Sequence, residues 1–372
     1  MWLIGLLALL TLGYAGLILH FKKGWDALPG FTSGPRTTPL PFVTVLIPAR
    51  NEEKNIGALL DALSKQTYPQ EKREVIVVDD HSTDRTAIIA RSFSFVKLIE
   101  LTDDCENSYK KRAIEKGIEQ ASAPFIICTD ADCVPEAEWL ETIGCTYLQN
   151  ECAFIAAPVL LENNSSVLGR FQTLDFLVMQ GITAAGIQQQ SIYMANGANM
   201  SYPKKVFEWV GGYKESKQLA SGDDFFLLHK IQKEYPSLIH FIKSEKAIIR
   251  TQALPTWSEF FQQRIRWASK SSHYDNRPLK LVLVLVGIYN LSLLVTLALS
   301  IVCPPFLLLA LASILVKSLI EWPFVHAVAK FFKVPISGFQ FLLFQPLHII
   351  YIPITGILSF QKKYVWKGRK VH

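Results

Sequence analysis

Apolar residues gather in long, nearly uncharged blocks close to both ends of the chain. Residues 2–19 carry no charge, and Lys22 and Lys23 follow them directly. Residues 281–302 form a second block, and residues 304–320 form a third. A helix of about 18 or more apolar residues is long enough to cross the hydrocarbon core of a bilayer. Both ends of the chain are therefore predicted to lie in a membrane.

The first block could be either a retained membrane anchor or a cleaved signal peptide. A signal peptide carries positive charge before the apolar run and small residues at a cleavage site after it. Neither feature is clear here, so we expect residues 1–21 to be a retained anchor. Positive charge gathers on the cytoplasmic side of membrane segments. The lysines after the anchor therefore place the N-terminus outside and the following residues in the cytoplasm.

A fourth apolar segment, residues 339–359, differs because it contains Pro346 and Pro353, and proline kinks or breaks helices. The tail over residues 361–372 is strongly basic and is expected in the cytoplasm. Three full crossings after the central part would put that tail outside. We therefore expect two or three segments over residues 279–360, with the proline-containing one re-entrant or lying in the membrane interface.

The pattern changes between these blocks. Residues 22–42 are expected to be a linker, and after them short continuous apolar runs alternate with amphipathic stretches. The continuous runs predict buried strands at residues 43–47, 74–78, 97–100 and 124–129. The stretches with apolar residues every three or four positions predict helices at residues 55–64, 83–92 and 110–121. This alternation predicts an α/β domain with a mainly parallel sheet over residues 43–255.

Composition agrees with a membrane protein. Half of the residues are hydrophobic and the mean hydropathy is +0.22, which excludes an ordinary soluble enzyme. The formal net charge is +6. Next to membrane segments, such a charge favours contact with anionic lipid, and no nucleic-acid partner is expected. The six cysteines lack the paired spacing of zinc or redox sites and are expected to be free thiols that mostly fill the core: Cys105, Cys128, Cys133, Cys145, Cys152 and Cys303.

Two acidic pairs follow predicted strands. Asp79 and Asp80 come after the second strand, and Asp130 and Asp132 come after the fourth. Ligands of parallel sheets gather at the carboxyl ends of the strands. Two carboxylates spaced two residues apart in an extended chain point to the same side, and they suit Mg²⁺ or Mn²⁺ bound to phosphate. Taken alone, such a pair is more often a polar turn that ends a strand than a metal site.

Other polar residues are expected near the same edge of the sheet. Arg50 and Glu52 follow the first strand, and Lys110 begins a helix where it could neutralise a phosphate or simply be solvated. We expect Ser82 or Thr83 to cap the next helix. His81 is expected to be a solvated loop residue.

Two later segments carry further candidates. Asp223 and Asp224 precede an apolar helix, where they either stabilise its N-terminus or supply a general base. A capping box, Thr256 with Glu259, predicts an amphipathic helix over residues 256–273 that would lie on the membrane. That helix holds side chains suited to a diphosphate and a sugar: Gln263, Arg266 and Trp267.

The order of these motifs resembles the family 2 glycosyltransferases with a GT-A fold. The resemblance runs from about residue 43 to residue 267, through VTVLIPARNEE, EVIVVDDHSTDRT, KKRAIEKGI, CTDADCVP, SGDDFFLL and QQRIRW. It implies an α/β, Rossmann-like nucleotide-diphospho-sugar transferase domain flanked by transmembrane helices. The membrane layout is similar to that of ceramide glucosyltransferases and processive polysaccharide synthases.

The resemblance also implies roles for residues. Asp130 and Asp132 match the DxD that holds a divalent metal, Mg²⁺ or Mn²⁺, on the diphosphate. Asp224 matches the catalytic base, and Asp223 stands where glutamate is usual. The QxxRW motif matches Gln263, Arg266 and Trp267. The residues expected to bind the nucleotide sugar are Pro48, Arg50, Glu52, Asp79, Asp80, Lys110 and Asp130.

These expectations describe an inverting membrane glycosyltransferase. The donor would be a nucleotide sugar, with UDP favoured, and the acceptor a lipid or lipid-linked molecule. The catalytic domain is expected in the cytoplasm, at the plasma membrane of a bacterium. The alternatives are a processive polysaccharide synthase and a non-catalytic subunit that binds nucleotide sugar. A metal-dependent nuclease or phosphotransferase would leave the QxxRW helix and the membrane segments without a role.

Overall fold

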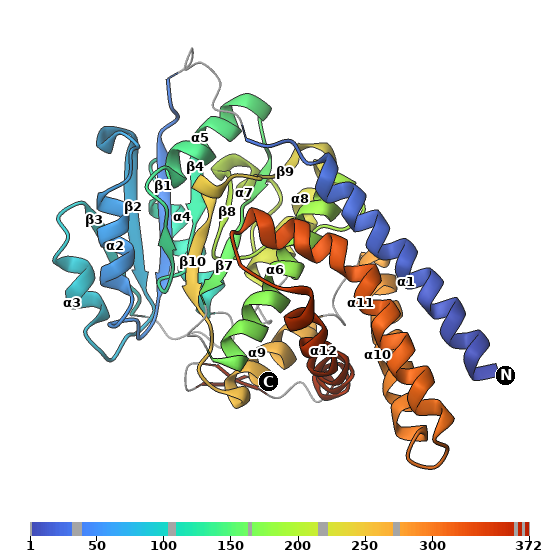
Figure 1. Cartoon of the computed structure of the whole chain (residues 1–372). Coiled ribbons are helices and arrows are strands. Elements are labelled where there is room, and N and C mark those ends of the chain that lie inside the picture. The colour runs from blue at the N-terminus through green and yellow to red at the C-terminus, as the bar shows by residue number, and fades with distance from the viewer. Residues whose placement is uncertain are drawn as a thin grey trace.

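The computed structural model describes residues 2–31, 39–102, 109–162, 166–214, 222–270, 276–360, 364–366 and 369–371 (Figure 1). Several sequence expectations fall outside this range. They concern Cys105, the middle of the linker, the end of the predicted interface helix after residue 270, and the side chains of the basic tail.

The core of the protein is a seven-stranded sheet in the order β3-β2-β1-β4-β8-β6-β9. Its strands are β1 (Val43–Ala49), β2 (Arg73–Asp79), β3 (Val96–Glu100), β4 (Phe125–Cys128), β6 (Phe154–Ala156), β8 (Met200–Pro203) and β9 (Ile239–Phe241). The first four strands run parallel, β8 is antiparallel to β4 and β6, and β6 runs parallel to β9. The mainly parallel α/β sheet expected from the sequence is therefore confirmed, with β8 as the reversed strand.

The continuous apolar runs form strands because both faces of this sheet are covered. Along β1, Val45 and Ile47 pack into one hydrophobic cluster and Leu46 packs into the other, and all three are fully buried. Burying one such side chain contributes roughly 1.5–3 kcal/mol. The helices that cover the sheet are α2 (Ile56–Ser64), α3 (Thr86–Arg91), α4 (Tyr109–Gln120), α5 (Trp139–Asn150), α6 (Val167–Gln188), α7 (Lys204–Trp209) and α8 (Asp223–Glu234).

A second sheet of three short strands joins the segment after the DxD motif to the segment before the QxxRW motif. Its strands are β5 (Val134–Pro135), β10 (Ile249–Gln252) and β7 (Val159–Glu162), in the order β5-β10-β7. Helix α9 (Trp257–Ala268) follows β10, so the sheet places this helix near the ends of the main strands. The smaller elements are 3₁₀ turns at Gln70–Lys72, Pro236–Leu238 and Glu245–Ala247, and a hairpin of β11 (Tyr364–Trp366) and β12 (Arg369–Val371).

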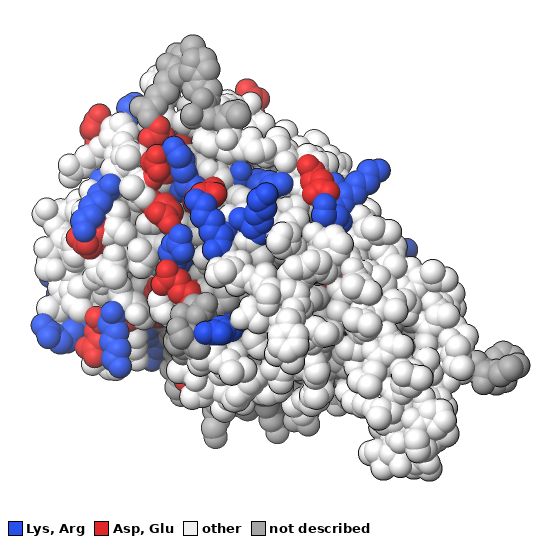
Figure 2. Space-filling view, viewed as in Figure 1, with Lys and Arg blue, Asp and Glu red and all other residues white. Residues whose placement is uncertain are grey.

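Four helices are long and apolar enough to cross a membrane: α1 (Trp2–Ala27), α10 (Arg277–Leu299), α11 (Pro305–Phe331) and α12 (Gly338–Ser359). Charged side chains are scattered over the sheet domain and over the end of α1 next to it, whereas the surface over α10 and the other end of α1 shows almost none (Figure 2). Helix α12 passes through Pro346 and Pro353 without a break. In Figure 1 it is seen nearly along its axis, while α1 and α11 run across the view.

Helix α1 is joined closely to the α/β domain. It continues to Ala27, so the first residues of the segment expected to be a linker are helical. Gly24 lies against α6, where an added Cβ would stand 2.7 Å from the backbone oxygen of Ala185. Gln189 on the same side donates a hydrogen bond to the backbone oxygen of His20 at 2.6 Å. The close approach at Gly24 lets the N-terminal helix pack against the α/β domain.

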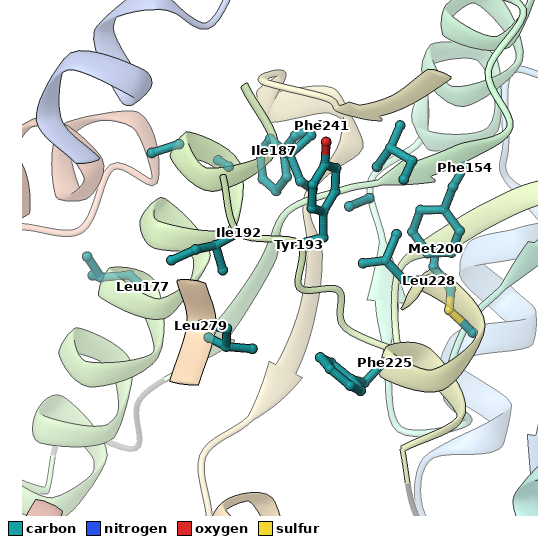
Figure 3. Packing of buried hydrophobic residues seen from close by; sticks show 14 of the residues in the cluster. Phe154, Leu177, Ile187, Ile192, Tyr193, Met200, Phe225, Leu228, Phe241 and Leu279 are labelled. Atoms are coloured by element: carbon teal, nitrogen blue, oxygen red, sulfur yellow. The ribbon is translucent and has the colours of Figure 1, made fainter. Parts of the chain in front are cut away.

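The same hydrophobic cluster extends from the sheet into the membrane helices. Figure 3 shows Met200 of the sheet and Phe225 and Leu228 of α8 in one cluster with Leu177 of α6, and Leu279 of α10 belongs to it too. The domain and the membrane helices therefore share one core, which limits independent motion between them.

The membrane helices also bury a polar cluster. Lys317 of α11 is fully buried and donates to Glu321 at 2.6 Å and to Gln345 of α12 at 2.8 Å. Gln345 in turn donates to Glu321 at 2.6 Å, and the Tyr14 hydroxyl of α1 donates to the same carboxylate. These bonds offset the cost of burying charge and hold three helices in one arrangement.

Candidate active site

A cavity of about 680 Å³ lies where the carboxyl ends of β1, β2 and β4 face helices α8 and α9. Most residues singled out from the sequence line it: Pro48, Arg50, Glu52, Asp80, Lys110, Asp130, Asp132, Asp224, Gln263, Arg266 and Trp267. Asp79 is the exception. It is 4 % exposed, and its Oδ2 accepts a hydrogen bond from the Ser82 N–H at 3.1 Å. The topology thus gathers residues from six separate motifs, while Asp79 supports the loop that follows it.

The loops after β1 and β2 hold one another through side chains. The N–H of Asn51 donates to Ser82 Oγ at 2.9 Å, and the N–H of Thr83 donates to Asn51 Oδ1 at 2.9 Å. The expectation that Ser82 or Thr83 caps the next helix is therefore wrong. Asp84 Oδ1 instead accepts from the N–H of Thr86 at 2.9 Å, where α3 begins. Pairing of the two loops takes the hydroxyl of Ser82 away from the helix end.

Arg50 and His81 flank Asp80 at the rim of the cavity. Arg50 Nη1 donates to the backbone oxygen of Asp80 at 2.6 Å, and His81 Nδ1 lies 2.9 Å from Asp80 Oδ1. The His81 side chain is only 27 % exposed, which corrects the expectation of a solvated loop residue. The backbone at His81 has a φ of +56°, in the left-handed region.

Glu52 combines a structural contact with a place in the cavity wall. Its N–H donates to Thr86 Oγ1 at 2.7 Å, and its carboxylate accepts from Asn55 Nδ2 at 2.7 Å. These bonds fix the side chain at the entrance of α2.

Lys110 forms the electrostatic centre of the cavity. Its Nζ lies 2.7 Å from Asp130 Oδ1 and 3.2 Å from Asp223 Oδ2. Burial opposes the charged form of Lys110, but Asp130 and Asp223 outweigh it and raise its pKa well above the ordinary value. Burial likewise acts to raise the pKa of Asp223, and the charge of Lys110 overcomes this and lowers it. One cation therefore lies between two carboxylates that come from distant parts of the chain.

Asp224 stands beside this trio with a more accessible carboxylate. Its Oδ1 accepts from the N–H of Phe225 at 2.7 Å and its Oδ2 accepts from the N–H of Gly197 at 3.2 Å. Gly197 has no room for a side chain, because an added Cβ would lie 2.9 Å from both Asp223 Oδ2 and Lys110 Nζ. Neither Gly197 nor the Lys110–Asp223 pair was assigned from the sequence.

Helix α9 forms the wall opposite these carboxylates. Thr256 caps it by accepting from the N–H of Glu259 at 3.2 Å. The Glu259 carboxylate accepts from the Thr256 hydroxyl at 2.8 Å, so the expected cap is present with a side-chain bond in place of the second backbone bond. Lys270 lines the cavity next to Arg266, and burial lowers its pKa. Its position four residues after Arg266 is the signal that could have identified it.

Residues 44–211 match the family model described as glycosyl transferase family 2. This part of the chain is therefore a glycosyl transferase family 2 domain.

Two curated relatives support this assignment. The probable glycosyltransferase YdaM of Bacillus subtilis (strain 168) is 29 % identical over 62 % of this chain and 55 % of its own length. The poly-beta-1,6-N-acetyl-D-glucosamine synthase of Staphylococcus epidermidis is 25 % identical over 61 % of this chain and 53 % of its own length. The chain thus spans about half the length of these two relatives.

A solved structure of the mannosyltransferase PcManGT from Pyrobaculum calidifontis, in complex with GDP-Man and Mn²⁺, is similar in fold. It superposes with a TM-score of 0.57 over 97 % of this chain and 96 % of its own, at 20 % identity. The chain therefore has the GT-A fold expected from its motifs.

The donor set at the DxD motif fits a hard divalent cation. Asp130 is partly exposed and Asp132 is exposed, and both line the cavity. Among the residues that the structure describes, no group of three His, Cys, Asp or Glu side chains could hold a metal on its own. Two carboxylates leave several positions of an octahedral ion for water and phosphate oxygens, which is how Mg²⁺ is commonly held.

The neighbouring cysteines take no part in such a site. Cys128 and Cys133 are free and buried, and burial raises the pKa of the Cys128 thiol to about 12. A protonated thiol is neither a metal ligand nor a nucleophile at neutral pH. Cys145, Cys152 and Cys303 are also free, so the expectation of unpaired thiols is confirmed for the described cysteines.

Proposed function

We propose that the chain is a membrane-bound inverting glycosyltransferase that moves a sugar from a nucleotide sugar to a lipid or lipid-linked acceptor. One observation carries the proposal. A single cavity next to the membrane helices holds an accessible carboxylate, a pair of metal-type carboxylates and a row of cations. These are the groups that glycosyl transfer to a hydroxyl requires.

The donor would lie with its diphosphate between the DxD motif and α9. Asp130 and Asp132 would hold the divalent metal, which supplies positive charge to the diphosphate. Arg266 and Lys270 face the cavity from α9 and would neutralise the charge that develops as the leaving group departs. Asp80, Glu52 and Arg50 lie at the far end of the cavity, where they would contact the nucleoside.

The chemical step is a single displacement. Asp224 would take the proton of the acceptor hydroxyl while that oxygen forms a bond to the anomeric carbon. The bond from this carbon to the diphosphate oxygen breaks, the nucleoside diphosphate keeps the electron pair, and the configuration inverts. Asp224 suits the role better than Asp223, whose side chain is 9 % exposed and ion-paired with Lys110 at 3.2 Å.

An acceptor from the membrane suits the rest of the cavity. Leu161, Phe176, Leu254 and Trp267 give part of its wall an apolar surface. Helix α9 continues this wall to the membrane helices, because Phe260 packs against Tyr351 of α12 with ring centroids 5.5 Å apart. Trp257 at the start of α9 is 41 % exposed, as expected for a residue at a lipid surface.

Contacts of α12 support the proposal that it lies along the catalytic domain. Its first turns meet α11 at Trp322, and Tyr351, later in the helix, meets α6 and α9. Contact of its second half with α6 and α9 supports a re-entrant or interfacial segment. This arrangement would keep the basic tail in the cytoplasm together with the catalytic domain.

A processive polysaccharide synthase is the second candidate, because one relative carries that activity in its name. Export of a polymer requires a water-filled path between the membrane helices. Here the space between them is filled, since Tyr289, Phe324 and Lys317 are at most 1 % exposed. This packing favours transfer to a lipid, and the length of the product on a gel distinguishes the two.

The test is a donor screen with the purified full chain in lipid nanodiscs. Release of nucleoside diphosphate from UDP-sugars and GDP-mannose is measured with and without Mn²⁺ and with a bacterial lipid extract. We expect release that needs both the metal and the lipid, together with a labelled glycolipid. No release from any donor would refute the proposal and favour a non-catalytic subunit.

A further inference from the structure

Arg264 lies inside the QxxRW segment without being one of its named residues. It is 4 % exposed and does not line the cavity. Its guanidinium nevertheless contacts Gln263 and Trp267, which both line the cavity. Nη1 donates to Gln263 Oε1 at 3.0 Å, and the guanidinium carbon lies 4.4 Å from the centroid of the Trp267 ring. One buried cation thus contacts two of the three motif side chains.

The Arg264 guanidinium is itself held from two other helices. Its Nη2 donates to Asp175 Oδ2 of α6 at 2.7 Å. The other oxygen of Asp175 accepts a hydrogen bond from the Tyr351 hydroxyl of α12. Phe260 packs against the guanidinium at 4.8 Å from its ring centroid. A planar guanidinium that donates from both Nη atoms and lies close to two aromatic rings leaves the side chain little freedom.

We propose that Arg264 is a positioning residue that fixes Gln263 and Trp267 at the cavity, and that Asp175 and Tyr351 connect this arrangement to membrane helix α12. The inference rests on the proposed function, because it assigns the motif side chains a part in sugar transfer. Arg264 acts through its neighbours, since it reaches no atom of the cavity itself.

A lysine cannot replace this arrangement, although it keeps the charge. The ammonium carries its three N–H donors on one nitrogen. It can pair with Asp175, but it has no second nitrogen to reach Gln263 and no flat surface for Trp267. Displacement of a reacting group by about 1 Å can lower a rate by as much as 10²-fold. We therefore expect Arg264→Lys to lower kcat at least tenfold, while the KM for the donor sugar stays within about twofold.

A spectroscopic readout separates positioning from general stability. The chain has eight tryptophans, so the protein is labelled with 5-fluorotryptophan and the Trp267 signal is identified by its loss in Trp267→Phe. We expect this ¹⁹F signal to shift in Arg264→Lys and in Asp175→Asn. Tyr351→Phe, which removes one hydroxyl, should shift it in the same direction by less.

The matched control is Lys317→Arg in the membrane cluster. It exchanges the cation of another buried ion pair while keeping the charge, and Lys317 contacts no residue of the cavity. The control should leave the Trp267 signal and kcat unchanged. The proposal is overturned if Arg264→Lys keeps both the wild-type signal and kcat, or if the control moves the signal as much. The ¹⁹F result stands whether or not the wild type transfers sugar, so the two proposals can fail separately.

Discussion

The neighbouring residues Asp223 and Asp224 offer a sharp test of the base assignment, because the structure gives them different surroundings. Asp224→Asn keeps the shape of the side chain. It also keeps an oxygen that can accept the hydrogen bond from the N–H of Phe225, which in the wild type is 2.7 Å from Oδ1. It removes the proton acceptor. General base catalysis typically contributes 10²–10⁴-fold, so kcat should fall by that factor, or about 2.7–5.4 kcal/mol of barrier. Thermal stability should change little, because the carboxylate is partly solvated.

Asp223→Asn should instead lower thermal stability and leave part of the activity. This carboxylate is buried and lies 3.2 Å from Lys110. Losing a hydrogen bond to a charged group costs about 1.5–3 kcal/mol. At about 2–4 °C per kcal/mol, the melting temperature should fall by roughly 3–12 °C. In this variant Lys110 still has its ion pair with Asp130, at 2.7 Å in the wild type, so we expect part of the activity to remain.

The assay compares nucleoside diphosphate release and thermal unfolding for the two variants in the same nanodiscs. Our reasoning is refuted if Asp224→Asn retains more than about a tenth of wild-type kcat, since a general base contributes at least 10²-fold. It is equally refuted if Asp223→Asn abolishes transfer while its melting temperature stays at the wild-type value, because Asp223 would then be the base.

Three further outcomes are expected. Asp132→Asn should raise the Mn²⁺ concentration for half-maximal activity at least tenfold without changing the melting temperature, because the side chain is exposed; an unchanged metal titration would contradict the site. Gly197→Ala should lower stability by about 1–3 kcal/mol, because its Cβ would lie 2.9 Å from Asp223 Oδ2. Gly57→Ala, whose Cβ would meet its nearest atom at 3.7 Å, is the control and should be tolerated. Burial lowers the pKa of Lys111 to about 8, so the unfolded chain binds more protons above that pH. Stability measured by thermal unfolding should therefore gain a rising contribution between pH 8 and about 10.5, which Lys111→Met should remove.

The amino-acid sequence determined the elements and the edge of the sheet where the site lies. Continuous apolar runs such as residues 43–47 became strands buried on both faces, and the acidic residues after them reached one cavity. A short stretch of sequence is enough to recognise a strand or a helix, because its buried apolar residues recur with the spacing typical of that element. Parallel strand ends meet at one edge, so Asp80 and Asp130 were placed together before any distance was known.

Only the tertiary structure decided which partner each polar side chain takes. Lys110 was expected near a phosphate, and it pairs with Asp130 and with Asp223, far along the chain. The hydroxyl of Ser82 bonds the neighbouring loop in place of its own helix. Arg264, unassigned in the sequence, holds Trp267 through contacts from three helices. A polar side chain bonds whatever group folding brings within about 3 Å, and that choice is made by the packing of distant segments and not by the local pattern.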